Sequence, residues 1–286
     1  MKKTVFLNGE YMMEDEAKVS IFDRGFIFAD GIYEVVPVFD STILDKKYFF
    51  ERLKYSLTEL SIDITQDENE ISTIINTLIE KNNIQEGGVY MQITRGVAER
   101  NFSFPKNIEP TFMAFAFEKN IINNPYAKTG VNIVTVEDIR WKRRDIKSIS
   151  LLGQCIAKNE ASKKEAFEGW MVEDGYITEG TSSSAYIVKD GIIITRGLSN
   201  EILPGIRRRI LLEIIQQNNM PIEERAFTVK EALNADEAFL SSATTFILPI
   251  INIDGKNISD AKPGRIYKRL RELYIESTLK RSGLIK

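Results

Sequence analysis

Histidine is absent from all 286 residues of the sequence. This absence excludes a Ser-His-Asp triad, a Cys-His dyad and a histidine-ligated zinc ion. An acid–base step in this chain must therefore use Lys, Glu, Asp or Tyr side chains, or belong to a cofactor. We expect no metal site.

Cysteine is almost as scarce, because Cys155 is the only one. The chain can form neither an internal disulfide nor a cysteine cluster, which fits a reducing compartment. Cys155 lies in the apolar stretch 151–157, so we expect it to be a small residue of the core.

Long hydrophobic runs are missing too. The apolar run at residues 4–7 stops at Asn8 and Gly9, which is too short for the core of a signal peptide. No stretch approaches the length of a membrane span. The net charge of −3 provides no general attraction to nucleic acid. We therefore expect a cytoplasmic protein without membrane or nucleic-acid partners.

Strands and helices interleave along the chain. Period-two and helical spacings of apolar residues indicate the type of each element. Asp174-Gly175 and Asp190-Gly191 lie between strand-like runs and predict hairpin turns. The predicted strands are 32–39, 89–94, 111–117, 131–136, 238–240 and 247–253, and the predicted helices are 47–60, 71–79, 152–166, one from about 205, and 264–279. Several strands joined by hairpins favour an α+β fold with mixed sheets and flanking helices.

A polar stretch at residues 118–125 ends in Asn123-Asn-Pro125, which is a turn and breaker signal. We interpret it as the link between two domains. The predicted organisation is a smaller α/β domain at 1–119, a linker at 120–128 and a larger domain at 129–286.

Lys147 is the candidate nucleophile. It follows a run with four other cations, Arg140-Trp-Lys-Arg-Arg144. Crowded positive charge would destabilise its ammonium form and make the neutral amine, which can form a Schiff base, reachable near neutral pH. A solvated basic patch is the alternative interpretation of the same run.

Two further residues, Glu179 and Arg52, are candidates because of the partner that each would need if it were buried. Glu179, if buried, would keep a ring nitrogen protonated, and otherwise it is a surface carboxylate in a turn. Arg52 lies near the edge of the apolar face of its helix. A partly buried guanidinium needs an anion, and here that anion is either a carboxylate of the core or a phosphate.

The segment 203–209, Leu-Pro-Gly-Ile-Arg-Arg-Arg, predicts an anion site, because Gly205 precedes a helix start whose N–H groups point outward. Arg207 and the two arginines after it oppose the helix dipole, so they either face an anion or point to water. The turn 241–245 supplies hydroxyl groups and backbone donors to a phosphate, or is a polar loop. Arg100 either clamps a carboxylate or lies on the surface.

Together these segments resemble the class IV pyridoxal-phosphate transaminases of fold type IV, and most of all the D-amino-acid transaminases among them. The resemblance covers roughly residues 3–275 in the family's order. Its motifs are Asp23-Arg-Gly-Phe-Ile-Phe-Ala-Asp-Gly-Ile-Tyr-Glu-Val-Val36, Glu51-Arg-Leu53, Thr94-Arg-Gly96 with Arg100, Val136-Glu-Asp-Ile-Arg-Trp141, Asp145-Ile-Lys-Ser-Ile-Ser-Leu-Leu-Gly153, Thr178-Glu-Gly180 and Leu203-Pro-Gly-Ile206.

The resemblance implies a role for each candidate. Lys147 would hold pyridoxal 5'-phosphate as a Schiff base and shuttle a proton, and Glu179 would pair with the pyridine nitrogen. Tyr33 and Arg100 would bind the substrate carboxylate. The other cofactor contacts it implies, most of them to phosphate, are Arg52, Ser182, Leu203, Gly205, Ile206, Arg207, Ser242 and Ala243. The C-terminal domain would be the main cofactor-binding domain.

The activity implied is ping-pong transfer of an amino group between D-amino acids, of the D-alanine or D-glutamate type, and 2-oxo acids. A homodimer is implied, with the site between the domains and completed by the partner chain. The sequence departs from the family where Phe102 replaces a common histidine, Arg207 a common threonine and Ala243 a hydroxyl. Backbone N–H contacts to phosphate survive the last two changes.

Other functions share this scaffold. They are branched-chain L-amino-acid transaminase, (R)-amine transaminase and aminodeoxychorismate lyase. An anion-binding protein that has the fold without the catalysis is the non-enzyme alternative, and it predicts a colourless protein.

Overall fold

The computed structural model describes residues 3–286, which form two compact units. The first unit extends to Asn120 and also takes in Ile146–Ser150 and Lys280–Lys286, and the second comprises Ile121–Asp145 and Leu151–Leu279. Each unit thus contains more than one stretch of the chain. The ranges 1–119 and 129–286, which treat each domain as one stretch, stay a prediction.

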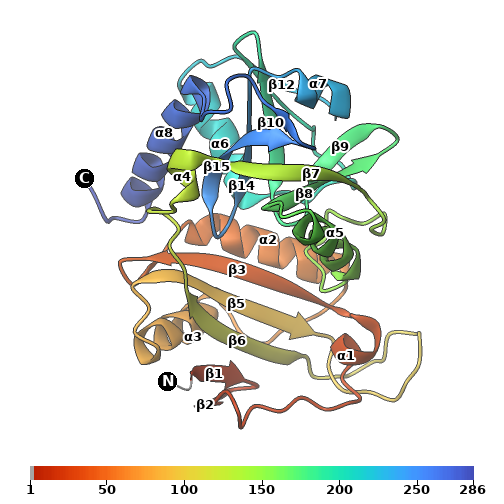
Figure 1. The fold of residues 1–286 in the computed structure, drawn as a ribbon. Helices are drawn as coiled ribbons and strands as arrows, with labels where there is room; N and C mark the ends of the chain where they lie inside the picture. The colour runs from red at the N-terminus through yellow and green to blue at the C-terminus, as the bar shows by residue number, and fades with distance from the viewer. Residues whose placement is uncertain (1–2) are drawn as a thin grey trace. The chain divides into compact units, whose positions relative to one another are not determined.

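The first unit is an antiparallel sheet with helices on one face (Figure 1). Its strands, in the spatial order β2-β1-β6-β5-β3-β4, are β1 Thr4–Leu7, β2 Glu10–Met13, β3 Gly31–Phe39, β4 Thr42–Ile43, β5 Glu86–Thr94 and β6 Thr111–Glu118. Ile32, Glu34 and Val36 are buried while Tyr33 and Val35 are half-buried, as the period of two in a strand requires. Pro37 lies where β3 is close to the sheet edge, the position in a sheet that tolerates proline.

Two helices, α2 Lys46–Glu59 and α3 Glu68–Lys81, pack on this sheet, and a short helix, α1 Arg24–Phe28, precedes β3. Asp67 caps α3 in a capping box with Glu70, which satisfies N–H groups of its first turn. The apolar residues at helical spacing in α2 and α3 are buried, so both predicted helices are confirmed.

The second unit contains a larger, mixed sheet. Its spatial order is β12-β11-β10-β14-β15-β7-β8-β9-β13, with β16 beside β15. The pairs β11/β12, β15/β7 and β7/β8 are parallel and the rest antiparallel. The strands are β7 Val131–Glu137, β8 Glu168–Glu173, β9 Tyr176–Gly180, β10 Ser184–Lys189, β11 Ile192–Thr195, β12 Ile222–Glu224, β13 Phe227–Thr228, β14 Glu237–Ser242, β15 Phe246–Ile253 and β16 Lys256–Asn257.

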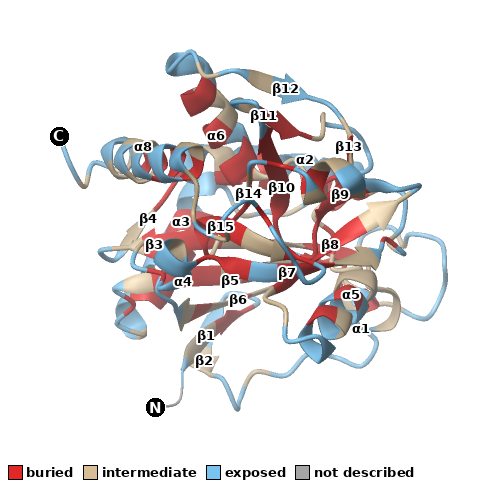
Figure 2. Ribbon diagram, turned by 45° about the horizontal axis from the view of Figure 1, so that its top comes forward, coloured by how far each residue is buried: buried red, intermediate tan, exposed pale blue. Residues whose placement is uncertain are grey.

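The helices of this unit are α4 Tyr126–Thr129, α5 Leu152–Lys163, α6 Ile206–Gln217, α7 Val229–Leu233 and α8 Arg265–Arg281. Buried residues concentrate on the strands and on one side of the helices (Figure 2). One antiparallel and one mixed sheet, each with flanking helices, confirm the predicted α+β class. No helix within residues 3–286 is long and apolar enough to cross a membrane.

Both Asp-Gly hairpins are confirmed. Asp174 and Gly175 have φ values of 52° and 79°, and Asp190 and Gly191 have values of 49° and 79°. Positive φ at both central residues matches the right-handed twist of the flanking strands. The turns join β8 to β9 and β10 to β11.

The expectations for α5 are partly wrong. The helix ends at Lys163 rather than Ala166, and Cys155 is exposed. The inward face of α5 carries Ala157 and Ala161, which are one turn apart. Cys155 lies off that face because two residues correspond to about 200° around a helix.

Candidate active site

The backbone of Lys147 is fixed in the first unit. The segment 146–150 runs beside β3, where Tyr33 N–H donates to the Lys147 carbonyl at 2.9 Å and Ile149 N–H donates to the Gly31 carbonyl at 3.0 Å. Lys147 N–H lies 3.3 Å from the hydroxyl oxygen of Ser56 on α2. Through these contacts the backbone around Lys147 pairs with β3 at the edge of the sheet.

The side chains of Lys147 and Tyr33 lie together. The Lys147 Nζ is 4.0 Å from the centroid of the Tyr33 ring, where the negative face of the ring attracts a cation. Tyr33 is on the half-buried face of the sheet, opposite Gln92 in the β3–β5 register. The structure therefore brings one predicted substrate residue to the predicted nucleophile.

The cations at 140–144 do not form the uncompensated cluster that we expected. Arg140 pairs with Asp138 and Glu179, and Arg144 pairs with Asp138 and Glu173. Lys142 and Arg143 also have carboxylate partners, Glu173 and Asp145. The side chains of Arg140 and Arg144 are buried, so the interpretation as a solvated patch is wrong for these two residues, whereas Lys142 is exposed. Crowding of like charge is therefore not a supported reason for reactivity at Lys147.

Glu179 ends up buried in the second unit, with 6% of its surface exposed. Arg140 Nη1 donates to its Oε1 at 2.5 Å, and Leu203 N–H reaches Oε1 and Oε2 at 3.2 Å each. Burial raises the pKa of the Glu179 carboxyl, against the influence of Arg140 and the Leu203 N–H. The surface-turn interpretation is wrong, and the structure joins two predicted cofactor residues, Glu179 and Leu203.

Arg52 has a carboxylate partner within the first unit. Its Nε donates to Glu34 Oε1 at 2.8 Å and its Nη2 to Oε2 at 2.7 Å. The side chains are 9% and 0% exposed. This fork fixes the orientation of the Arg52 guanidinium.

The start of α6 and the end of β14 meet in the second unit. Gly205 is the N-cap of α6 and contributes no side-chain hydrogen bond. A Cβ on Gly205 would lie 2.9 Å from the Ser184 hydroxyl oxygen, and Ser184 is opposite Ser241 in the β10–β14 register. The next residue, Ser242, shares a 2.8 Å hydrogen bond with Thr245. Ile206 therefore begins its helix beside the turn that contains Ala243.

The three arginines of α6 have different environments. Arg207 is buried, and its Nη1 donates to the Tyr274 hydroxyl at 2.5 Å. Arg208 is buried and pairs with Glu224 at 2.7 Å. Arg209 is half-exposed and lies 3.5 Å from Glu213. The interpretation that these residues point to water is wrong for Arg207 and Arg208.

Ser182 belongs to a turn organised by Glu168, a residue that sequence reasoning missed. Glu168 is 2% exposed. It accepts hydrogen bonds from Thr181 Oγ1, Ser182 N, Ser182 Oγ and Ser183 Oγ at 2.7 to 3.0 Å. The four consecutive hydroxyl residues at 181–184 were the signal that an acceptor was needed, but no neighbouring residue in the sequence identified Glu168 as that acceptor.

Arg100 is exposed on a loop of the first unit. Its guanidinium carbon is 5.6 Å from the ring centroid of Phe28 and 5.3 Å from that of Phe102. Arg24 anchors the loop, because it donates to the Asn101 carbonyl at 2.5 Å and to Asp30 at 2.7 Å. Phe102 is 77% exposed.

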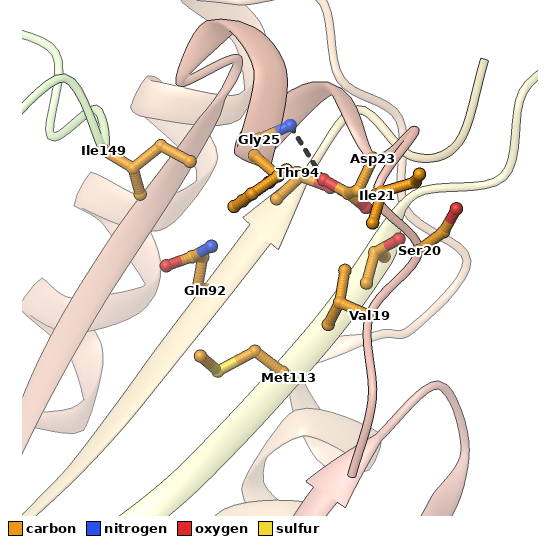
Figure 3. Close-up of a pocket in the computed structure, with 11 residues that line it drawn as sticks. Val19, Ser20, Ile21, Asp23, Gly25, Gln92, Thr94, Met113 and Ile149 are labelled. Carbon is orange, nitrogen blue, oxygen red and sulfur yellow. Dashed lines mark hydrogen bonds between the residues drawn. The ribbon is translucent and has the colours of Figure 1, made fainter. Parts of the chain in front are cut away.

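A pocket of about 380 Å³ opens in the first unit between the segment 19–26 and strands β5 and β6 (Figure 3). Gln92 and Ile149 connect it to the Lys147 neighbourhood, since Gln92 is opposite Tyr33 and Ile149 is two residues beyond Lys147. Its lining is Val19, Ser20, Ile21, Asp23, Gly25, Phe26, Gln92, Thr94, Thr111, Met113 and Ile149. The candidate catalytic, cofactor-binding and substrate-binding residues are not in this lining. Within residues 3–286, acidic and cysteine side chains form no group able to hold a metal ion.

The model of the family "Amino-transferase class IV" matches residues 31–253. The chain belongs to this family. Proteins called D-alanine aminotransferase are similar to it. The one from Staphylococcus haemolyticus is 42% identical over 96% of this chain and 98% of its own length, and the one from Staphylococcus aureus strain N315 is 43% identical over the same shares.

The fold of the class IV aminotransferases is confirmed by solved structures. The branched-chain amino acid aminotransferase of Escherichia coli has a TM-score of 0.90 to this chain at 21% identity, and the match covers 97% of this chain and 95% of that one. A branched-chain amino acid aminotransferase from T.th., solved with pyridoxamine 5'-phosphate, also has a TM-score of 0.90 at 21% identity, over 98% of this chain and 95% of that one. At this identity the likeness demonstrates the fold alone.

Proposed function

We propose that this class IV aminotransferase moves the amino group between D-amino acids and 2-oxo acids in a ping-pong reaction, with pyridoxal 5'-phosphate as cofactor. D-Alanine and D-glutamate are the substrate types. The similarity over nearly the whole chain to proteins called D-alanine aminotransferase supports this substrate class. The solved structure with pyridoxamine 5'-phosphate supports the cofactor.

The observation that carries the proposal is the environment of Glu179. The Oε1 atom of this buried carboxylate accepts a hydrogen bond from Arg140. The Leu203 N–H lies at equal distance from Oε1 and Oε2 and is shared between them. A carboxylate oxygen has room for two donors. Glu179 therefore fits the role of partner to a protonated ring nitrogen, which is what the cofactor would present.

The phosphate end of the cofactor also fits residues of this chain. The first N–H groups of a helix have no partner inside the helix and favour an anion. At α6 these belong to Ile206 and Arg207, after a glycine that adds no side-chain cap. The phosphate would have three further contacts in this proposal. They are Ser242, the backbone at Ala243, and Arg52, whose guanidinium Glu34 orients. Leu203 would pack on the ring, and Ser182, held by Glu168, would line it.

When bound, the cofactor accepts the substrate's amino group and draws electrons from its Cα. Lys147 has the reactive amine, which anchors the cofactor and then moves the proton released at Cα. Tyr33, in contact with Lys147 Nζ, orients the substrate carboxylate together with Arg100. Phe102 cannot donate a hydrogen bond, so the carboxylate depends on these two residues.

We also propose that the protein works in the cytoplasm as a homodimer. Its single cysteine forms no disulfide within the chain, as in reducing compartments. Large apolar side chains are exposed, and they include Phe26 at 76% and Phe102 at 77% in the first unit and Leu152 at 74% in the second. In a homodimer, a second copy of the chain would cover exposed apolar side chains of this kind.

The test is the absorption spectrum of the purified protein. We expect a yellow protein whose colour bleaches with D-alanine and not with L-alanine, and returns when a 2-oxo acid is added. Bleaching by L-leucine instead would establish the branched-chain alternative. Release of pyruvate from aminodeoxychorismate without an acceptor would indicate the lyase, and a chiral (R)-amine as the best donor would indicate the amine transaminase. A colourless protein that does not bind the cofactor would overturn the proposal.

A further inference from the structure

A line of alternating charges, buried from Arg144 onward, leads to Glu179 in the second unit. Glu173 accepts Arg144 at 2.7 Å, and Arg144 lies 3.2 Å from Asp138. Asp138 accepts Arg140 Nη2 at 2.7 Å, and Arg140 Nη1 reaches Glu179 at 2.5 Å. The side chains of Arg144, Asp138 and Arg140 are 1%, 0% and 4% exposed, so water does not screen the pairs among these three residues, whereas Glu173 is 21% exposed.

Arg140 is fixed in one orientation. Its Nε donates to Asp138 Oδ1 at 2.9 Å while its Nη2 holds Oδ2. Asp138 is fixed in turn by the Thr178 hydroxyl at 2.6 Å. Burial alone would raise the pKa of Asp138, and the hydrogen bond and charge of Arg140 help to lower it overall. Asp138 therefore stays ionised and directs the remaining edge of the guanidinium toward Glu179.

Among residues 3–286, Arg140 is the cation that contacts Glu179, and it does so at Oε1; the charge of Asp138, on the far side of Arg140, acts in the opposite sense on the pKa of Glu179. Oε1 accepts Arg140, and Oε2 has capacity for another donor. A proton shared between a buried carboxyl and a pyridine nitrogen can lie on either group, and burial favours the neutral pair. A positive charge behind the carboxylate stabilises the ionic pair, in which the proton is on nitrogen.

We infer that Arg140, oriented by Asp138, is a positioning residue that holds Glu179 as a carboxylate and so keeps the proton on the cofactor's pyridine nitrogen. The inference rests on the proposed function, in which Glu179 faces that nitrogen. Arg140 does not touch substrate or cofactor in this role. It acts through Glu179.

The test uses the holoprotein with cofactor labelled by a magnetic nitrogen isotope in the ring, so that the ring-nitrogen NMR shift reports protonation directly. The wild type is expected to have the shift of a protonated nitrogen. In Arg140→Gln the shift should move toward that of the neutral nitrogen, and kcat should fall by about 10- to 100-fold, by analogy with the loss of outer partners at metal sites. Arg140→Lys keeps the charge and should retain much of the wild-type shift.

Arg144→Gln is the matched control. It removes an equally buried cation from the same line, one carboxylate further from Glu179, so the ring nitrogen should stay protonated. If Arg140→Gln does not fold because Asp138 loses its partner, the double variant Asp138→Asn/Arg140→Gln removes both charges together and is expected to have the neutral-nitrogen shift.

The outcomes separate the two proposals. A protonated ring nitrogen in Arg140→Gln, or in the double variant, would overturn the role of Arg140 while leaving the transaminase intact. A neutral ring nitrogen in an active wild-type enzyme would overturn it too. A wild-type protein that does not bind the cofactor would instead contradict the proposed function itself.

Discussion

The buried ion pair between Glu34 and Arg52 offers the most quantitative prediction for the first unit. The two side chains are 0% and 9% exposed and form a fork with distances of 2.8 and 2.7 Å. Glu34→Gln keeps the shape and one acceptor, but it removes the negative charge that balances a buried guanidinium. Breaking a buried pair from one side destabilises a protein by about 3–5 kcal/mol.

We expect Glu34→Gln to lower the stability of the cofactor-free protein by about 3 kcal/mol, the lower end of that range, because glutamine still accepts a hydrogen bond. At roughly 2–4 °C per kcal/mol this corresponds to a Tm lower by about 6–12 °C. The assay is thermal and urea unfolding followed by circular dichroism. Both tryptophans, Trp141 and Trp170, lie in the second unit, so their fluorescence would miss changes in the first.

The control is Glu51→Gln on α2, the helix that carries Arg52. Its pair with Lys47 is 4.0 Å apart, and both side chains are exposed. Exposed pairs contribute about 0–1 kcal/mol, so this variant should unfold near the wild-type Tm. The double variant Glu34→Gln/Arg52→Met should recover stability relative to Glu34→Gln, since it removes the unbalanced cation. A loss in Glu34→Gln no larger than that in Glu51→Gln would refute the reasoning.

Three further predictions concern the proposed site and its surroundings. Lys147→Ala should lower the transamination rate by at least about 100-fold because proton transfer loses its base. Lys164→Ala, at the exposed end of α5, is the control and should not change the rate. An undiminished rate in Lys147→Ala would refute the catalytic role of Lys147. Gly205→Ala places a Cβ 2.9 Å from the Ser184 hydroxyl oxygen, so this hydroxyl has to rotate away, and titration calorimetry should find cofactor binding weaker by about 0.5–1.5 kcal/mol. Gly197→Ala, whose Cβ would have ordinary contacts, is the control. Equal cofactor affinities in the two variants would contradict the predicted crowding of Ser184 by the new Cβ. Burial raises the pKa of Tyr186 to about 12 from about 10 in an unfolded chain, so its contribution to stability is complete below pH ~10 and is lost as the pH rises toward ~12. In urea unfolding, the free energy of unfolding of Tyr186→Phe should fall less steeply with pH over that window than that of the wild type. An equal slope in the two proteins would contradict the raised pKa of Tyr186.

The parts of the fold that depend on neighbours in sequence could be predicted. Asp174-Gly175 and Asp190-Gly191 need positive φ and produce hairpins wherever they occur between strands. The apolar spacing of α2 and α3 required one buried face, and Gly205 before an apolar-periodic run marked the start of α6.

The partners of the buried charges could not be predicted, because they come from distant parts of the chain. Arg207 meets Tyr274, which is 67 residues away, and Arg140 meets Glu179, which is 39 residues away. Carboxylates that balance the basic run at 140–144 were visible in the sequence, but their distances in space were not. For this reason the predicted crowding of Lys147 was wrong, whereas the choice of Glu179 as a buried carboxylate agreed with the structure.

The prediction that Cys155 is buried was wrong for a related reason. An apolar stretch of sequence predicts burial on average, but on α5 only the face with Ala157 and Ala161 turns inward. Which side of a weakly amphipathic helix is buried depends on the strands against which it packs. The sequence around Cys155 does not contain that information.

The central claim is that the amine of Lys147 holds the cofactor. Borohydride reduction of the purified protein, followed by peptide mass mapping, tests it most directly. The account predicts one labelled peptide, with the pyridoxyl phosphate mass added at Lys147, and no such label in Lys147→Ala. Label on another lysine, or none on a protein that transaminates D-alanine, would contradict the account.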